Sequence, residues 1–234
     1  MTRHYLLVDD NQAFAENLAE ILEAHGALVD VALDASAAMR RLETTRYDAL
    51  VTDMRMPGLS GAELVHLARQ GDPGLPVVLL SAYAQDAQLV DARRDGLLAV
   101  MSKPGKVPQL VALLERARRG GIVLLVEDDV ALAENLGEAL AARGLTVCTA
   151  SSVREVDAMA VQPFVALVDL RLPDGATGES LERVRERFPD TPTVVITGLA
   201  DATVPAGSEL FKKPFDTVAL VDRLEQLFAR TGPA

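Results

Sequence analysis

The chain has 234 residues, of which 49% are hydrophobic and 24% are charged, a composition typical of one large or two small globular domains. Its 34 acidic residues outnumber 23 basic ones, and the net charge of −11 argues against nucleic-acid binding, which requires a basic face. No run of about eighteen apolar residues predicts a membrane span, and the N-terminal apolar run is too short for a signal peptide, so we expect a cytoplasmic protein.

An internal repeat divides the chain into two units of similar length. Residues 6–32 match residues 124–150 without a gap, and ALVTDMRMPG at 49–58 matches a later ALVDLRLPDG. In this second match Asp53 corresponds to Asp169. A unit of half the chain has the size of a small domain rather than of a solenoid repeat. We therefore expect one domain at 1–120 and another at 121–234.

Each unit alternates short apolar runs with amphipathic segments. The apolar runs predict buried strands at 5–8, 27–32, 49–52, 77–80 and 98–102, and then at 122–126, 145–149, 165–168, 193–196 and 209–212. Between the strands, leucines recur at helical spacing, and Gly26 and Gly144 stand where a helix should end. Cys148, the only cysteine, lies in a strand, and we expect it to fill space there. The alternation predicts an α/β fold with two doubly wound, five-stranded parallel sheets.

The junction between the units is short. The last helix of the first unit is predicted to run to about residue 119, leaving only Gly120 and Gly121 before the next strand. Such a junction favours a restricted relative orientation of the domains, since flexible tethers are longer. Arg116, Arg118 and Arg119 are expected to form a solvated helix end that the helix dipole stabilises.

Polar residues follow the predicted strands at the edge where parallel sheets bind ligands. In the first unit they are Asp9, Asp10, Asp53, Ser81 and Lys103, and in the second Glu127, Asp128, Asp169, Thr197 and Lys213. Three clustered carboxylates repel one another, and Mg²⁺, which prefers oxygen ligands, would relieve the repulsion. A carboxylate beside the ion could attack a phosphoryl group, which a lysine and a hydroxyl would then bind.

LLVDDN, LVTDMRMPGLSG, VVLLSAY and MSKPG, in this order, resemble the bacterial response-regulator receiver family, and the second unit repeats the resemblance. The resemblance implies the flavodoxin-like strand order 2-1-3-4-5 and phosphorylation of Asp53 and Asp169 by a histidine kinase or phosphotransfer protein. It implies that Mg²⁺ is held by these aspartates together with the paired acids Asp9, Asp10, Glu127 and Asp128. Ser81, Thr197, Lys103 and Lys213 would contact the phosphoryl group. The peptide bonds at 103–104 and 213–214 would be cis.

Simpler interpretations exist for several of these residues taken singly. Asp10, Asp128 and Asp129 could cap the helices that follow them, because aspartate is favoured at helix N-caps. Asp53 and Asp169 could be turn residues, and the lysines solvated charges at strand ends. Capping explains neither two adjacent acids in both units nor their relation to an acid on a distant strand.

The sequence departs from the family pattern in two respects. An aromatic residue commonly lies three positions before the lysine, and here Val100 and Leu210 occupy those positions. In the second unit the segment between Thr197 and Lys213 is shorter and contains Pro205 and Gly207. We therefore predict a short, irregular or absent fourth helix there.

These observations favour a stand-alone tandem receiver that signals through phosphorylation-controlled protein–protein interaction, without a separate output domain. As an alternative, one receiver, and more readily the second, is a scaffold or phosphate sink. We expect no enzyme beyond self-catalysed phosphorylation and dephosphorylation. Phosphatases of the haloacid dehalogenase type need a second aspartate two residues after the nucleophile, where this chain has Arg55 and Arg171. By family analogy this position tunes the lifetime of the phosphate.

Overall fold

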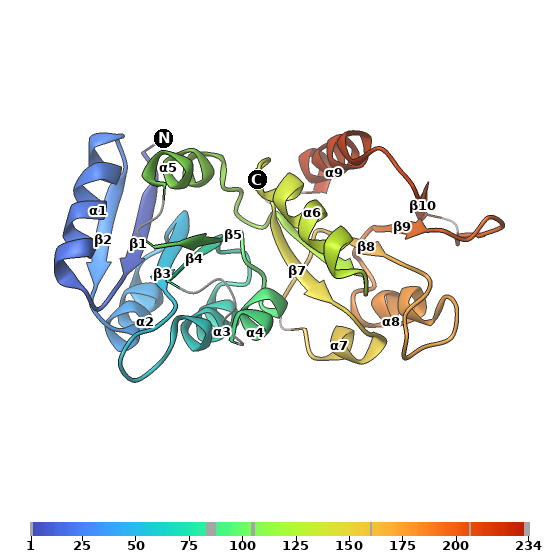
Figure 1. The fold of residues 1–234 in the computed structure, drawn as a ribbon, viewed down its shortest axis with the longest axis horizontal. Helices are drawn as coiled ribbons and strands as arrows, with labels where there is room; N and C mark the ends of the chain where they lie inside the picture. The colour runs from blue at the N-terminus through green and yellow to red at the C-terminus, as the bar shows by residue number, and fades with distance from the viewer. Residues whose placement is uncertain (1, 83–87, 104–105, 160, 206, 232–234) are drawn as a thin grey trace.

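The computed structural model describes residues 2–82, 88–103, 106–159, 161–205 and 207–231. These residues form two five-stranded sheets side by side, each with helices on both faces (Figure 1). The first sheet contains β1 (His4–Val8), β2 (Leu28–Ala32), β3 (Ala49–Asp53), β4 (Val77–Ser81) and β5 (Ala99–Ser102). The second contains β6 (Ile122–Val126), β7 (Thr146–Ala150), β8 (Val165–Val168), β9 (Thr193–Thr197) and β10 (Glu209–Lys212).

The two sheets have the same topology. Their strand orders are β2-β1-β3-β4-β5 and β7-β6-β8-β9-β10, and every pairing between these strands is parallel. Because β1 lies between β2 and β3 in its sheet, and β6 lies between β7 and β8, the direction in which strands are added reverses beside these two strands. This confirms the predicted doubly wound fold and the order 2-1-3-4-5, and it places the carboxyl ends of β1 and β3, and of β6 and β8, side by side.

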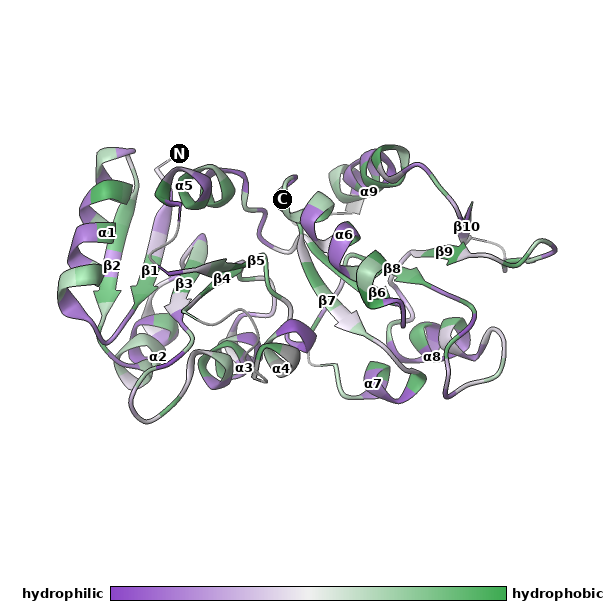
Figure 2. Cartoon of the chain, in the orientation of Figure 1, coloured by the Kyte–Doolittle hydropathy of each residue, from purple (hydrophilic) through white to green (hydrophobic). Residues whose placement is uncertain are grey.

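The central strands are buried on both faces, as their continuous apolar sequences predict. All five residues of β3, β4, β6 and β9 are buried, and Figure 2 shows the strands as largely hydrophobic while the helices carry mixed colours. Cys148 is fully buried in β7, so the prediction that it fills space on a strand is confirmed.

The helices of the first half are α1 (Gln12–Ala24), α2 (Ala35–Thr44), α3 (Gly61–Gly71), α4 (Gln88–Arg94) and α5 (Val107–Arg116). Those of the second half are α6 (Val130–Ala141), α7 (Val153–Asp157), α8 (Glu179–Arg187) and α9 (Thr217–Thr231). The ends of α1 and α6 follow from local sequence. Asn11 and Asp129 cap their N-termini, and Gly26 and Gly144 adopt positive φ angles just beyond their C-termini.

The second half has no helix between β9 and β10 among its described residues, so the predicted loss of the fourth helix is confirmed. Pro205 lacks the amide hydrogen that a helix interior requires, and Gly207 has a φ of 90°. Leu199, Ala202 and Val204 from this segment instead pack against the buried core of the sheet.

The end of the first half differs from its prediction. Helix α5 ends at Arg116 rather than near residue 119, because the backbone of Ala117 is extended. Arg118 and Arg119 are not a solvated helix end. Arg118 pairs with Glu225 of α9 at 2.5 Å, and Arg119 pairs with Asp72 at 2.5 Å.

The junction is tied to both halves by backbone hydrogen bonds. Gly120 N donates to Gly74 O of the first half at 2.9 Å, while Arg118 N donates to Gly144 O of the second at 2.9 Å. Thr146 N of β7 donates to Gly121 O at 2.8 Å. These bonds are consistent with the restricted orientation that the short junction predicts.

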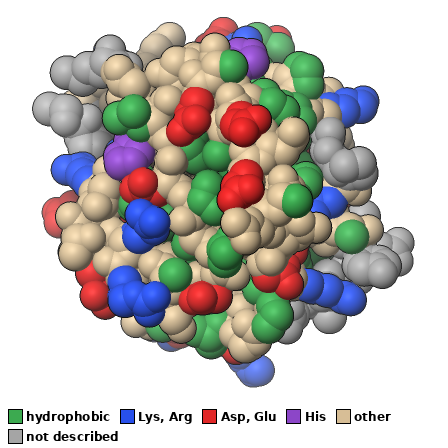
Figure 3. Space-filling model, turned by 90° about the vertical axis from the view of Figure 1, so that its left-hand side faces the viewer, with side chains coloured by type: hydrophobic (Ala, Val, Ile, Leu, Met, Phe, Trp, Pro, Cys, Tyr) green, Lys and Arg blue, Asp and Glu red, His purple; other side chains and the backbone are tan. Residues whose placement is uncertain are grey.

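The face of the first half that is turned away from the second carries interspersed acidic, basic and hydrophobic side chains (Figure 3). Among the described residues, no helix is both long and apolar enough to cross a membrane.

Candidate functional site

Three carboxylates converge at the carboxyl end of the first sheet. Asp9 directly follows β1 and is fully buried, Asp53 is the last residue of β3, and Asp10 is exposed. Each offers an oxygen within 4.8 Å of oxygens from the other two. Because like charges this close repel, the group suits a hard divalent cation with oxygen ligands.

A lysine bridges the two buried carboxylates of this cluster. Lys103 Nζ lies 2.5 Å from Asp9 Oδ2 and 2.9 Å from Asp53 Oδ2. Lys103 N also donates to Ser81 O at 2.9 Å, which fixes the lysine beside the end of β4. Ser81 is 3% exposed. The fold thus brings all five predicted residues of the first unit to one edge of the sheet.

The second sheet carries a corresponding cluster. Glu127, Asp128 and Asp169 offer oxygens that lie within 4.8 Å of one another. Lys213 Nζ lies 2.7 Å from Glu127 Oε2 and 2.6 Å from Asp169 Oδ2. Thr197, the last residue of β9, is buried at the same edge.

The charges of the second cluster affect one another. Burial raises the pKa of Glu127 above its usual range, and the hydrogen bond from Lys213 opposes this rise. Although burial disfavours the charge on Lys213, its hydrogen bonds to Asp169 and Glu127 raise its pKa above the usual value. The lysine therefore stays protonated and can bind an anionic group at this site.

Backbone amides orient the carboxylates in both clusters. Asn11 N donates to Asp9 Oδ1 at 3.0 Å, and Asp129 N donates to Glu127 Oε1 at 3.1 Å. The N-caps of α1 and α6 are Asn11 and Asp129, so capping does not account for Asp10 and Asp128. The simpler interpretation holds for Asp129 alone among the three aspartates considered.

A glycine packed behind Asp53 was not among the predicted site residues. A Cβ atom on Gly61 would lie 2.1 Å from Asp53 O, so only glycine permits the start of α3 to approach the end of β3 this closely. Gly61 N donates to Met54 O at 2.9 Å, and Gly178 N of the second half donates to Leu170 O at 2.8 Å. A glycine eight or nine residues after each acceptor candidate is the sequence signal for this hydrogen bond. The steric contact belongs to Gly61, since a Cβ atom on Gly178 would meet nothing within 4 Å.

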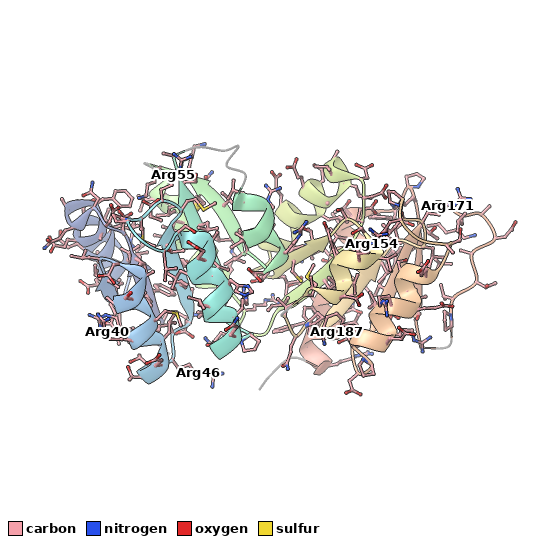
Figure 4. The ribbon with its side chains drawn as sticks, turned by 90° about the horizontal axis from the view of Figure 1, so that it is seen from below. Arg40, Arg46, Arg55, Arg154, Arg171 and Arg187 are labelled. Atoms are coloured by element: carbon pink, nitrogen blue, oxygen red, sulfur yellow. The ribbon has the colours of Figure 1, made fainter. Side chains whose placement is uncertain are left out.

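The arginines that follow the acceptor candidates lie near the clusters. Arg55 and Arg171 are both exposed, and Figure 4 shows them along the same edge of the molecule. Arg171 N donates to Asp169 Oδ1 at 3.1 Å, which places this residue against the second acceptor candidate. Each acceptor candidate is thus followed two residues later by an exposed cation.

The same set of three carboxylates, one hydroxyl and one lysine thus occurs at the carboxyl edge of two sheets of identical topology. A family profile described as "Response regulator receiver domain" matches residues 5–115 and again residues 123–225. The chain belongs to the response regulator receiver family. Its two halves are receivers in tandem, referred to below as receiver one and receiver two.

The chain is similar to one relative over almost its full length and to others over part of theirs. The chain is 49% identical to "Response regulator receiver protein Anae109_2439" of Anaeromyxobacter sp. (strain Fw109-5) over 231 residues, which are 98% of this chain and 97% of that one. It is 32% identical to the response regulator FleR of Pseudomonas aeruginosa over 55% of this chain and 27% of that one. The receiver domain of Francisella response regulator 1452 matches 49% of this chain and 94% of its own, with 26% identity and a TM-score of 0.46.

Further predictions near the receiver sites can be compared with the structure. The Lys213–Pro214 bond is cis, as predicted, whereas the bond at 103–104 lies outside the described residues. Val100 and Leu210, which replace the usual aromatic residue, are partly buried and pack against the cores of their receivers.

Proposed function

We propose that Asp53 and Asp169 accept phosphoryl groups from the phosphohistidine of a histidine kinase or phosphotransfer protein. In this step a carboxylate oxygen attacks phosphorus, the P–N bond breaks, and the imidazole nitrogen leaves with the bonding electrons. Mg²⁺ bound by the three carboxylates of a cluster would neutralise charge on the transferring group. The observation that supports the proposal most strongly is the lysine held within 3 Å of the acceptor candidate in both receivers.

The other residues of each site have defined roles in this proposal. Ser81 and Thr197 would donate hydrogen bonds to the phosphoryl oxygens, while Lys103 and Lys213 would pair with them. Asp9 and Asp10, or Glu127 and Asp128 in receiver two, would hold the ion. The domains extend over 1–120 and 121–234, and the phosphorylated protein signals by binding a downstream protein rather than by catalysis.

Receiver two has a second candidate role. Its described residues form no helix between β9 and β10, where receiver one has α4. Without a counterpart of α4 among its described residues, receiver two lacks the surface that α4 provides in receiver one. This difference favours a role for receiver two as a scaffold or phosphate sink. Labelling of Asp169 separates these roles, because a sink accepts phosphate and a pure scaffold does not.

Mg²⁺-dependent labelling by acetyl phosphate, read by intact mass, tests the proposal. The wild-type chain is expected to gain up to two phosphoryl groups, Asp53→Asn and Asp169→Asn one each, and the double variant none. Asp190→Asn, which changes an exposed aspartate, serves as a control and should label like the wild type. Unchanged labelling of the double variant would contradict the assignment of the acceptors.

A further inference from the structure

The two receivers meet at the edges of their sheets. Leu97, just before edge strand β5, exchanges two backbone hydrogen bonds with Val147 of edge strand β7, at 3.1 and 3.2 Å. The preceding Gly96 lies so close that a Cβ atom there would be 3.4 Å from Cys148 Cβ and from Thr146 Cγ2. The segment that follows α4 of receiver one thus docks onto β7 of receiver two.

A buried arginine holds this docking segment in place. Arg69 of α3 is 1% exposed, and it donates to Asp95 O and Gly96 O, both at 2.7 Å, and to Pro73 O at 2.9 Å. Because Arg69 satisfies these carbonyl groups inside receiver one, its hydrogen bonds help to fix the shape of the segment that contacts receiver two.

An ion pair connects α4 of receiver one to receiver two. Arg94 Nη2 lies 2.5 Å from Glu155 Oε1, and Glu155 Oε2 accepts from Ser151 N at 2.7 Å and from Ser151 Oγ at 3.0 Å. Ser151 directly follows Ala150 of β7, whose carbonyl group accepts from Glu127 N at 2.9 Å. A chain of contacts therefore leads from α4 to the backbone of Glu127, whose side chain belongs to the second acidic cluster.

The same interface surrounds a cleft of about 550 Å³. Its walls include Arg93, Arg94 and Val100 from receiver one, and Glu127 and Asp128 from receiver two. The second acidic cluster thus lies at the boundary between the receivers. Arg93 pairs with Glu134 across this cleft at 3.4 Å. Both side chains are about half exposed, so this ion pair contributes little to stability.

We infer that receiver one positions the metal-binding carboxylates of receiver two through the Arg94–Glu155 pair. The docking surface is β7 with the start of α7, and its partner is α4 and the segment after it in the same chain. Any coupling between the two acidic clusters through this pair would be reciprocal, so that binding at one would change affinity at the other by the same factor. Both parts of this inference rest on the proposed function: the metal part rests on its ion sites, and the phosphate part on its acceptor aspartates.

Metal binding to the full-length chain tests the inference without any phosphorylation. Asp9→Asn with Asp53→Asn disables the first cluster, and Mn²⁺ binding to the second is then followed by the electron paramagnetic resonance of the free ion. Arg94→Gln is expected to weaken Mn²⁺ binding about two- to fivefold, the range for a partly exposed ion pair. Glu155→Gln should do the same, and combining it with Arg94→Gln should add little further loss.

Arg93→Gln provides the matched control, since it removes the same charge from the same cleft without breaking the link to Glu155. Loss of a nearby cation alone favours binding of a cation, so Arg93→Gln should leave Mn²⁺ affinity unchanged or slightly raised. Equal shifts in Arg93→Gln and Arg94→Gln, or no shift in Arg94→Gln and Glu155→Gln, would overturn the inference.

Acetyl phosphate labelling supplies the second arm. In the wild-type chain, the Mg²⁺ concentration for half-maximal labelling of Asp169 should differ from that in Asp53→Asn, and Glu155→Gln should reduce this difference. Complete absence of labelling with the Mn²⁺ shifts intact would contradict the proposed function and leave the positioning role standing. Normal labelling without any shift in Mn²⁺ affinity would support the proposed function and contradict the positioning role of the Arg94–Glu155 pair.

Discussion

The two acidic clusters use different side chains to reach the same arrangement. Receiver one has Asp9 where receiver two has Glu127, yet each carboxylate accepts from the amide two residues later and pairs with the lysine after the last strand. The longer glutamate keeps both contacts while remaining 3% exposed. Burial raises its pKa, and the charge of Lys213 compensates in part. The lysine is thus as much a part of the acidic cluster as the acids.

Cys148 gives a prediction at the residue scale. Burial raises the pKa of its thiol from 9.0 to about 12, so the reactive thiolate stays rare throughout the neutral and mildly alkaline range. We expect the folded chain to resist iodoacetamide at pH 8 to 9 and the guanidinium-unfolded chain to react readily, as measured by intact mass. Rapid alkylation of the folded chain would contradict this burial.

At the scale of single elements, two helix glycines are present for different reasons. One affects only helix propensity, and the other is required by close packing. Gly137 lies within α6, where a Cβ atom would meet nothing within 4 Å, and Ala19 occupies the corresponding place in receiver one. Gly61 begins α3, where a Cβ atom would collide with the backbone of Asp53. The same substitution should therefore have opposite effects in the two helices.

Gly137→Ala is expected to raise the free energy of unfolding by about 1 kcal/mol, because alanine restricts the unfolded chain and favours the helix. Gly61→Ala is expected to lower it by about 2 kcal/mol, since the backbone must shift to accommodate the methyl group. Urea denaturation measures both changes. Gly61→Ala should also reduce labelling of Asp53 by acetyl phosphate, whereas Gly137→Ala should not. Equal effects of the two substitutions on stability would show that the contact at Gly61 is relieved at little cost.

Most elements and both clusters could be predicted from the sequence because they follow local rules. Buried parallel strands are continuous apolar runs, and the polar residues that end them meet wherever the strands lie side by side. The end of α5 could not be predicted, and the arginines after it were wrongly expected to be solvated. Their partners, Asp72 and Glu225, are remote in sequence. Asp72 meets Arg119 through the fold of receiver one, and Glu225 of receiver two meets Arg118 where the receivers dock. The docking itself depends on backbone groups of Leu97 and Val147, which leave no pattern in the side chains.

At the scale of the whole molecule, one repeated position serves two purposes. Gly26 and Gly144 both have positive φ angles after a helix, at 86° and 76°. Gly26 has open space around it, whereas a Cβ atom on Gly144 would lie 1.8 Å from Arg116 O of receiver one. Gly144 therefore both ends its helix and allows the backbone of receiver one to pack closely against receiver two.

Gly26→Ala should lower the free energy of unfolding by about 1 kcal/mol, the cost of a left-handed conformation for a residue with a side chain. Gly144→Ala carries the same cost and also a collision at the receiver interface, so we expect a loss of about 3 kcal/mol or more. Thermal and urea unfolding provide the comparison. Similar losses in the two variants would indicate that the interface adjusts freely around Gly144.

The pairing of Leu97 with Val147 also bears on solubility. Two separate open sheets have four edges, and each free edge offers unpaired backbone groups to the strands of another molecule. In this chain the β5 and β7 edges face each other, which leaves β2 and β10 as the outer strands. β10 is four residues long with a charged residue at each end, and β2 carries Asp30 at its centre. The bridge between Leu97 and Val147 thus shields part of two edges that would be free in separate receivers. Charged residues on β2 and β10 disfavour edge-to-edge pairing at the other two.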